Sequence, residues 1–181
     1  MLTDIQVRKL TKLFGLYDTN DDGVLVHQDF INLGRRLAAI RRRLQASPHQ
    51  ERILAHLEQD WMSLCAAADR NHDAQITLDE WLAYYDGVLD DIKQYMSRII
   101  ALVTLLFDAF DQDGDGRISE REWMDLLAVF NVLPIYASSV FLNLDINQDG
   151  SLNQDEVLNL IHDFFYLSEP YAPANFIFGP Y

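Results

Sequence analysis

Residues 111–122 place carboxylates at segment positions 1, 3, 5 and 12, a glycine at position 6 and a backbone carbonyl at position 7. Oxygen ligands at this spacing form the cage that Ca²⁺ requires, and the acid at position 12 closes the cage with both oxygens. Gly116 supplies the positive φ of the sharp turn that directs the early carboxylates inward. Ser119 and Glu122 form a capping-box pattern at the start of a helix. The segment therefore predicts a Ca²⁺ loop between two helices.

The same pattern occurs three more times, which gives four predicted loops, numbered here in chain order: 18–29, 69–80, 111–122 and 145–156. Loop 4 matches the pattern fully, with Asn147 as a neutral ligand. Loop 1 ends in Asp29, whose shorter side chain suits a tighter cage that tolerates Mg²⁺. Loop 2 has Ala74 in place of the turn glycine, and holding alanine at positive φ costs about 1 kcal/mol. We expect this strain to weaken binding at loop 2 without abolishing it.

Each loop offers ligands at positions 1, 3, 5, 7 and 12, and position 7 contributes its backbone carbonyl. The candidate metal ligands are Asp18, Asn20, Asp22, Val24 and Asp29 in loop 1, Asp69, Asn71, Asp73, Gln75 and Glu80 in loop 2, Asp111, Asp113, Asp115, Arg117 and Glu122 in loop 3, and Asp145, Asn147, Asp149, Ser151 and Glu156 in loop 4. This set predicts up to four Ca²⁺ ions, with Mg²⁺ competing most readily at loop 1. The sequence contains no histidine cluster typical of zinc and no catalytic constellation, so we expect a protein that is not an enzyme.

The predicted fold is all-α, with four helix–loop–helix units in two pairs that pack into one compact body. Apolar periodicity predicts helices over about 3–17, 27–45, 48–67, 78–90, 92–110, 120–130, 134–144 and 154–167. Position 8 of every loop is apolar and can form a β-bridge with a neighbouring loop, which pairs loop 1 with loop 2 and loop 3 with loop 4: Leu25, Ile76, Ile118 and Leu152. The expected domains are an N-terminal pair (1–90), a C-terminal pair (91–167) and an apolar tail that packs on the core (168–181). We expect one body because no Pro/Gly-rich tether separates the two pairs.

The apolar fraction, net charge and cysteine count of the chain argue against several classes of protein. Apolar residues make up 49% of the chain, which is typical of a globular protein rather than a disordered acidic one. The net charge of −14 disfavours a nucleic-acid partner. A single cysteine excludes an internal disulfide, and no stretch reads as a signal peptide, a membrane span or a myristoylation site. We therefore expect a cytoplasmic protein without stable membrane insertion.

The four EF-hand units, the long interval between the first two loops, Asp29 at the end of loop 1 and the C-terminal sequence resemble the sarcoplasmic calcium-binding proteins. The C-terminal sequence in question is Ala174-Asn175-Phe176-Ile177-Phe178-Gly179-Pro180-Tyr181. Calexcitin and the bacterial protein calerythrin are similar in plan, and the resemblance covers essentially the whole chain. It implies a compact all-helical fold and an intracellular Ca²⁺/Mg²⁺ buffer or, in some members, a signalling protein. Many members have lost one or more loops, whereas all four loops keep their ligands here.

A Ca²⁺/Mg²⁺ buffer is our first interpretation. One alternative is a Ca²⁺ sensor that exposes an apolar surface to a protein target, although no target is indicated; the other is a carrier of an apolar, luciferin-type small molecule. The tail favours the buffer because it could fill the groove that a target helix would take. For the carrier, His162, Phe165 and Tyr166 resemble pocket residues of coelenterazine photoproteins, but tryptophan is missing and core packing is the better account. We interpret the arginines from Arg35 to Arg43 as a solvated face rather than a lipid-binding or partner-binding patch.

Overall fold

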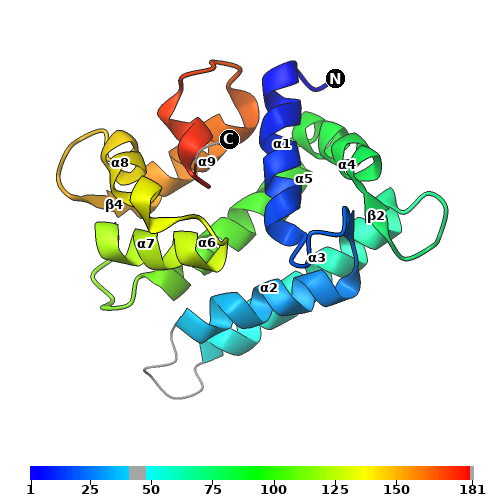
Figure 1. Ribbon diagram of the computed structural model, residues 1–181, viewed down its shortest axis with the longest axis horizontal. Helices are drawn as coiled ribbons and strands as arrows, with labels where there is room; N and C mark the ends of the chain where they lie inside the picture. The colour runs from blue at the N-terminus through cyan, green and yellow to red at the C-terminus, as the bar shows by residue number, and fades with distance from the viewer. Residues whose placement is uncertain (41–47, 180–181) are drawn as a thin grey trace.

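The computed structural model describes residues 1–40 and 48–179, which form helices and two short antiparallel strand pairs (Figure 1). The N-terminal half contains α1 (Asp4–Tyr17), β1 (Val24–Leu25), α2 (His27–Ile40), α3 (Pro48–Ala68), β2 (Ile76–Thr77) and α4 (Leu78–Asp90). The C-terminal half contains α5 (Ile92–Tyr95), the π-helix η1 (Met96–Ile100), α6 (Ala101–Phe110), β3 (Arg117–Ser119), α7 (Glu120–Val129), α8 (Pro134–Leu144), β4 (Ser151–Asn153), α9 (Gln154–Tyr166) and the 3₁₀ helix η2 (Pro173–Phe176). The predicted all-α fold of four EF-hands in two pairs is confirmed.

The loops pair as the sequence predicts. Leu25 lies opposite Ile76 in the β1–β2 ladder, and Ile118 lies opposite Leu152 in the β3–β4 ladder. These four side chains are at most 3% exposed. Each bridge therefore ties two loops together through a buried apolar contact, so that the loops of a pair hold each other in place.

Three helices, α4, α7 and α9, begin at the metal loop that precedes them, and that loop supplies the cap. In α4, α7 and α9 the N-cap residues Thr77, Ser119 and Asn153 accept a hydrogen bond from the amide of the residue at loop position 12, whose side chain bonds back to the cap amide. Such a capping box satisfies two backbone amides that would otherwise lack partners. The acid that closes each loop therefore also begins the exit helix.

The segment predicted as one helix over 92–110 is instead three elements, α5, η1 and α6. A π-turn adds a residue to the helical repeat and redirects the side chains that follow, which apolar periodicity does not reveal. Two other differences are smaller. The tail, predicted to lack helix, contains the 3₁₀ turn η2, which begins at a proline. The predicted helix over 27–45 is described only to Ile40, and residues 41–47 lie outside the described residues.

The two halves pack directly against each other through α3 with α6, α2 with α7 and α1 with α9. Gln6 donates from Nε2 to the carbonyl of Phe165 at 2.8 Å, and Lys9 donates from Nζ to the carbonyl of Leu167 at 2.7 Å. Lys9 is 1% exposed, and its burial lowers the pKa of the ammonium group to about 8. Apolar periodicity does not predict a charged lysine on the buried face of this helix. Its ammonium group instead caps the C-terminal carbonyls of α9.

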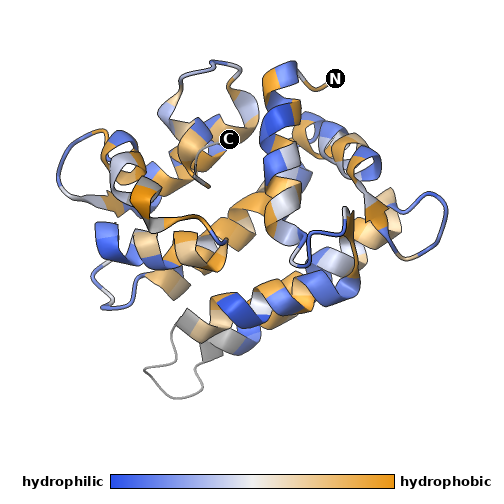
Figure 2. Ribbon diagram, viewed as in Figure 1, coloured by the Kyte–Doolittle hydropathy of each residue, from blue (hydrophilic) through white to orange (hydrophobic). Residues whose placement is uncertain are grey.

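The hydrophobic core continues across both halves. Helix α6, which is coloured hydrophobic along most of its length in Figure 2, packs against α3 and α9. In the N-terminal pair Trp81 is 2% exposed and its ring lies 5.9 Å from that of Phe14 and 4.6 Å from that of Tyr85. Cys65 is half-buried at the edge of this core, and burial raises the pKa of its thiol, which suits a packing role.

The last described part of the tail, which includes η2, lies against α8 and α9. Ile177 is 2% exposed, and the Phe178 ring lies 5.1 Å from that of Phe164. Gly179 has φ +87°, and a Cβ at this residue would lie 2.8 Å from Cγ1 of Val132. Only glycine fits this close approach without strain. In contrast Tyr171, earlier in the tail, is 92% exposed.

Candidate metal-binding loops

The acid at position 1 organises each loop by accepting hydrogen bonds from the backbone amides of positions 5 and 6. The distances are 3.2 and 2.8 Å for Asp18, 3.3 and 3.0 Å for Asp69, 3.1 and 2.9 Å for Asp111, and 3.2 and 2.8 Å for Asp145. The four loops therefore have the same hydrogen-bond framework, including loop 2 with its alanine at position 6. This framework turns the chain around the side chains at positions 1, 3 and 5.

The turn requires two left-handed residues in every loop. Position 6 has positive φ in all four loops. In loop 2 this position is Ala74, and its φ is +59° although it is not a glycine. Position 4 is also left-handed, at Asp21, His72, Gly114 and Gln148. The sequence analysis missed this second position, although the glycine at position 4 of loop 3 was a signal for it. His72 is exposed at this position.

Loop 3 gathers three early carboxylates, because its position 3 is an aspartate where the other loops have asparagine. Carboxylate oxygens of Asp111, Asp113 and Asp115 all lie within 4.8 Å of one another. Carboxylates this close repel each other unless a cation neutralises them. An all-oxygen donor set suits Ca²⁺ or Mg²⁺ rather than zinc. These residues fit the metal that the loop pattern predicts, and the ion would supply the charge that holds the loop closed.

The closing acid at position 12 spans the loop. Glu122 accepts hydrogen bonds from the Gln112 amide at 2.7 Å and, with its other oxygen, from the Ser119 amide at 2.8 Å. Glu80 makes the equivalent bonds, and those from Thr77, followed by the one from the Arg70 amide, lower the pKa of this carboxyl. A low pKa keeps the position 12 acid in the ionised form that binds a cation.

Loops 1 and 4 vary this arrangement. In loop 1 the shorter Asp29 still reaches both sides, with oxygens 3.1 Å from the Thr19 amide and 3.0 Å from the Val26 amide. In loop 4 Glu156 accepts from the side-chain amide of Asn147 instead of the amide at position 2, and from the Asn153 amide at 2.9 Å. The backbone thus adapts to an aspartate at the end of loop 1. How many oxygens Asp29 gives to an ion stays a prediction.

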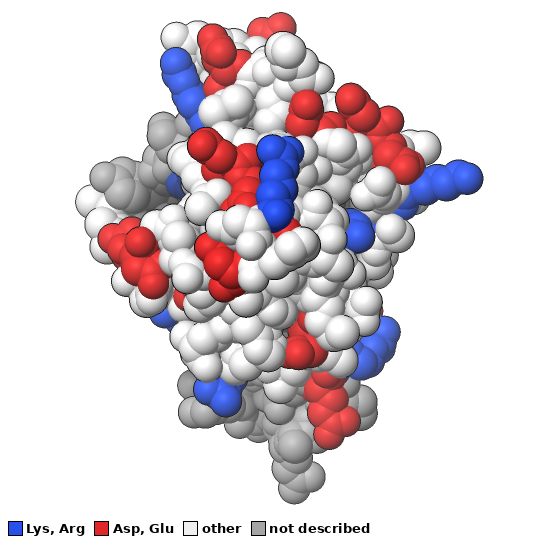
Figure 3. All heavy atoms as spheres, turned by 90° about the vertical axis from the view of Figure 1, so that its right-hand side faces the viewer, with Lys and Arg blue, Asp and Glu red and all other residues white. Residues whose placement is uncertain are grey.

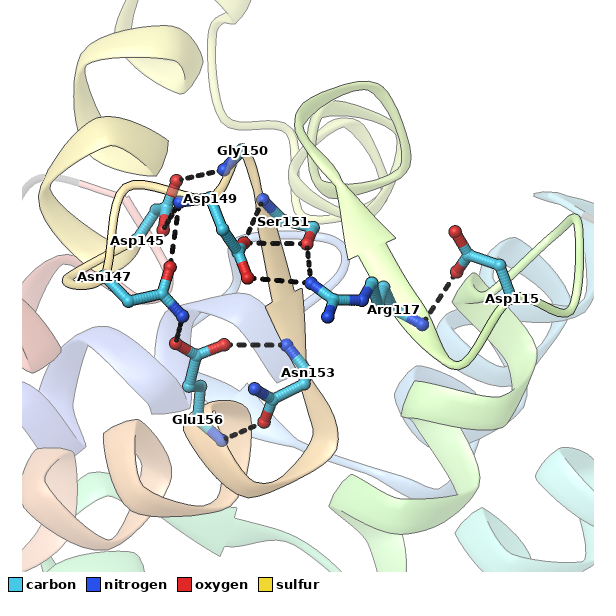
Figure 4. A network of polar contacts seen from close by, with 9 residues as sticks. All are labelled: Asp115, Arg117, Asp145, Asn147, Asp149, Gly150, Ser151, Asn153 and Glu156. Atoms are coloured by element: carbon cyan, nitrogen blue, oxygen red, sulfur yellow. Dashed lines mark hydrogen bonds and ion pairs between the residues drawn. The ribbon is translucent and has the colours of Figure 1, made fainter.

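The side chain of Arg117 in loop 3 forms hydrogen bonds with loop 4, which the sequence pattern does not predict. Arg117, expected to offer only its carbonyl, extends its guanidinium across the β3–β4 ladder to Asp149 Oδ2 and Ser151 Oγ, both at 2.7 Å (Figure 4). This bond lowers the pKa of Asp149. Because Asp149 is the position 5 ligand of loop 4, a cation in loop 4 would compete with Arg117 for it.

The remaining candidate residues do not converge on one site. Phe165 lines a central cavity, whereas the side chain of His162 is 56% exposed and the Tyr166 hydroxyl donates to the carbonyl of Leu89 at 3.1 Å. The rings of His162 and Tyr166 stack on each other with centroids 4.8 Å apart, and of the three residues Phe165 is the one that lines the cavity. In the arginine segment Arg35 is exposed, as predicted, and Arg41, Arg42 and Arg43 lie outside the described residues.

Acidic side chains outnumber basic ones in this chain, with 28 Asp and Glu against 14 Lys and Arg. Figure 3 shows the face at the right of Figure 1, where acidic side chains form several clusters with fewer basic side chains between them. This distribution agrees with the net charge of −14 and is unfavourable for a polyanion such as nucleic acid. Within residues 1–40 and 48–179, no helix combines the length and the apolarity that crossing a membrane requires.

Known proteins share both the motif and the fold. The family model described as EF hand matches residues 102–127. The chain is 25% identical over 179 residues to sarcoplasmic calcium-binding proteins I, III and IV of Branchiostoma lanceolatum, covering 96% of this chain and 95% of the relative. It is 21% identical over 168 residues to calerythrin of Saccharopolyspora erythraea, covering 92% and 95% of the two chains. The solved structure of a sarcoplasmic calcium-binding protein from amphioxus superposes with a TM-score of 0.78 at 20% identity, covering 100% of both chains. The chain is therefore similar over nearly its whole length to the sarcoplasmic calcium-binding proteins and calerythrin, and residues 102–127 match the EF-hand model.

Proposed function

We propose that this calcium-binding protein is an intracellular Ca²⁺/Mg²⁺ buffer, with ions held by all four loops at the residues named above. The observation that carries the proposal is the burial of the tail. Ile177 and Phe178 line the apolar interior of the C-terminal pair together with Trp123 and Phe110. A sensor would offer this surface to a target helix.

The tail should occupy this apolar surface in preference to a helix from another protein. It is covalently attached and therefore acts at a high effective concentration. Asn175, which is fully buried, donates to the carbonyls of Glu169 and Pro170 at 2.8 and 3.1 Å and fixes the bend that brings the tail back. If this contact persists in the Ca²⁺-loaded protein, the tail occupies the groove of the C-terminal pair that a target helix would take, which is the property that distinguishes a buffer from a sensor.

The methionines support the same conclusion. Adaptable target grooves are commonly rich in methionine. Here Met62 and Met96 are 58% and 53% exposed on α3 and η1, and neither lines the cavity behind the tail. A cytoplasmic location is part of the proposal, since a buffer acts where Ca²⁺ is transient. A role in catalysis is not part of it, because the related proteins above are named for calcium binding.

Fluorescence of the dye ANS tests the proposal. Full-length protein with saturating Ca²⁺ should bind little dye, whereas removal of residues 174–181 should expose apolar surface and raise the fluorescence strongly. Gly179→Val provides a second variant, since its side chain would meet Val132 at positive φ and displace only the end of the tail. Strong Ca²⁺-induced dye binding by the full-length chain would instead favour a sensor that exposes its surface to a protein target.

A further inference from the structure

Loops 1, 2 and 4 have an asparagine at position 3, but the asparagine of loop 4 has a different partner. In loops 1 and 2 its side-chain amide donates to Oδ2 of the position 5 aspartate, at 2.7 and 2.8 Å. In loop 4 Asn147 donates instead to Oε1 of the closing acid, Glu156. The same residue type at the same loop position therefore takes part in a different network.

The partner that Asn147 would have by analogy, the position 5 aspartate Asp149, is already bound. In all four loops Oδ1 of this aspartate accepts a hydrogen bond from the position 7 amide, at 3.1, 2.8, 2.8 and 3.0 Å in chain order. Oδ2 is therefore the oxygen left for a metal ion. In loop 4 the Arg117 guanidinium donates to this Oδ2 at 2.7 Å, at the oxygen that the asparagine amide contacts in loops 1 and 2.

Arg117 belongs to loop 3, and its positive charge is directed at loop 4 (Figure 4). A second contact, to Ser151 Oγ at 2.7 Å, holds the guanidinium in place. Asp149 attracts the guanidinium most strongly, and Asp115 and Glu156 add to that attraction. The residues at position 7 of the other three loops are uncharged. Loop 4 therefore differs from the other loops in receiving a positive charge from the position 7 side chain of its partner loop.

We propose that Arg117 is an internal cation for loop 4, which neutralises Asp149 while the loop holds no metal and has to leave Asp149 before Ca²⁺ can bind there. The guanidinium and the metal ion need the same oxygen, so they cannot occupy it together. The proposal rests on the proposed binding of Ca²⁺ at loop 4 and adds a residue that regulates it. Because one contact has both roles, its removal should destabilise the Ca²⁺-free protein and strengthen Ca²⁺ binding at loop 4.

NMR titration of ¹⁵N-labelled full-length protein with Ca²⁺ measures the effect on binding. The amides of Gly116 and Gly150 donate to the position 1 aspartates of loops 3 and 4, at 2.9 and 2.8 Å, so each amide reports on its own loop. Arg117→Gln should raise the Ca²⁺ affinity of loop 4 relative to loop 3 about threefold, a modest effect because the Arg117 and Asp149 side chains are 48% and 37% exposed.

Arg121→Gln is the matched control, because Arg121 is an exposed arginine at position 11 of loop 3. A general loss of positive charge from loop 3 should affect both variants, whereas the loss of the contact with Asp149 affects Arg117→Gln alone. The ratio of the two affinities should therefore stay unchanged in the control. An equal change of this ratio in both variants, or no change in Arg117→Gln, would overturn the proposal.

Thermal unfolding in EDTA measures the effect on the Ca²⁺-free protein. Arg117→Gln should lower its melting temperature by about 2 °C, and Arg121→Gln should leave it unchanged. A double-mutant cycle with Asp149→Asn, also in EDTA, should show that the substitutions at residues 117 and 149 are coupled. This cycle involves no bound metal, so it separates failure of this proposal from failure of Ca²⁺ binding at loop 4. Independent effects of the two substitutions, a higher melting temperature in Arg117→Gln, or a Ca²⁺-free protein without a cooperative transition would each contradict an internal cation.

Discussion

Replacing Ile177 by alanine tests how firmly the tail is held. The side chain is 2% exposed, and the change removes three buried carbon groups, worth about 0.8 kcal/mol each in transfer free energy. The space left behind would join a cavity of about 60 Å³ that Ile177 already lines, so the site has little means of collapsing. Adding the cavity term gives an expected loss of about 3 kcal/mol in the free energy of unfolding, within the range for large-to-small core substitutions.

Urea unfolding at saturating Ca²⁺, followed by tryptophan fluorescence, measures this loss. Tyr171→Ala is the matched control, because it removes a larger side chain from the same tail at a residue that is 92% exposed. The control should change stability by no more than about 0.5 kcal/mol. Equal, small effects of both substitutions would refute a tail that is packed on the core, and with it the main support for the buffer.

Three further predictions concern the loops and the central cavity. Ala74→Gly should raise the Ca²⁺ affinity of loop 2 about fivefold, because the loop then no longer requires an alanine at φ +59°. Calorimetry measures this affinity. An unchanged affinity would mean that the strain at residue 74 does not weaken binding. Arg117→Gln should tighten loop 4 about threefold by freeing Asp149 from its ion pair, and weaker binding in this variant would contradict the competition. Asp60→Asn should gain stability relative to the natural protein as pH rises from about 4 to 7. Burial beside the central cavity raises the pKa of Asp60 from 3.8 to about 6 in the folded state, so the folded protein holds this proton more strongly, and ionisation across that window costs on the order of 3 kcal/mol that the asparagine variant avoids. A pH-independent difference between the two proteins would refute this assignment.

Much of the fold followed from loop chemistry alone. A loop with acids at positions 1 and 12 and an apolar position 8 fixes a helix on each side and a bridge to a partner, which is why the β-ladders at Leu25 and Ile118 form as predicted. The geometry around Gly116 and Ala74 was also predictable, because only one backbone conformation completes the turn. The turn geometry and the helix starts depend on neighbours within about a dozen residues along the chain, and the ladders follow from the repetition of the loop pattern.

The features that escaped prediction depend on residues distant in sequence. Lys9 is a poor core residue by type, and its burial makes sense only with the C-terminal carbonyls of α9 beside it. The π-turn at η1 leaves the apolar pattern of 92–110 almost unchanged, and residues of this turn line the central cavity together with residues distant in sequence. Likewise Arg117 was placed correctly in its loop, while its guanidinium is directed by loop 4. The contacts of long side chains such as Lys9 and Arg117 depend on residues distant in sequence, and apolar periodicity does not predict such contacts.

Titration calorimetry with Ca²⁺ tests the central claim, that all four loops bind cations, by measuring the number of bound ions and their affinities. We expect four ions per chain, with the tightest steps at loops 3 and 4, the weakest at loop 2, and Mg²⁺ competing most strongly at loop 1. Glu122→Gln and Glu156→Gln should each remove a tight step, because each substitution removes a charged closing ligand. Two or fewer ions at saturation, or loss of the tightest step in Glu80→Gln, would contradict this account.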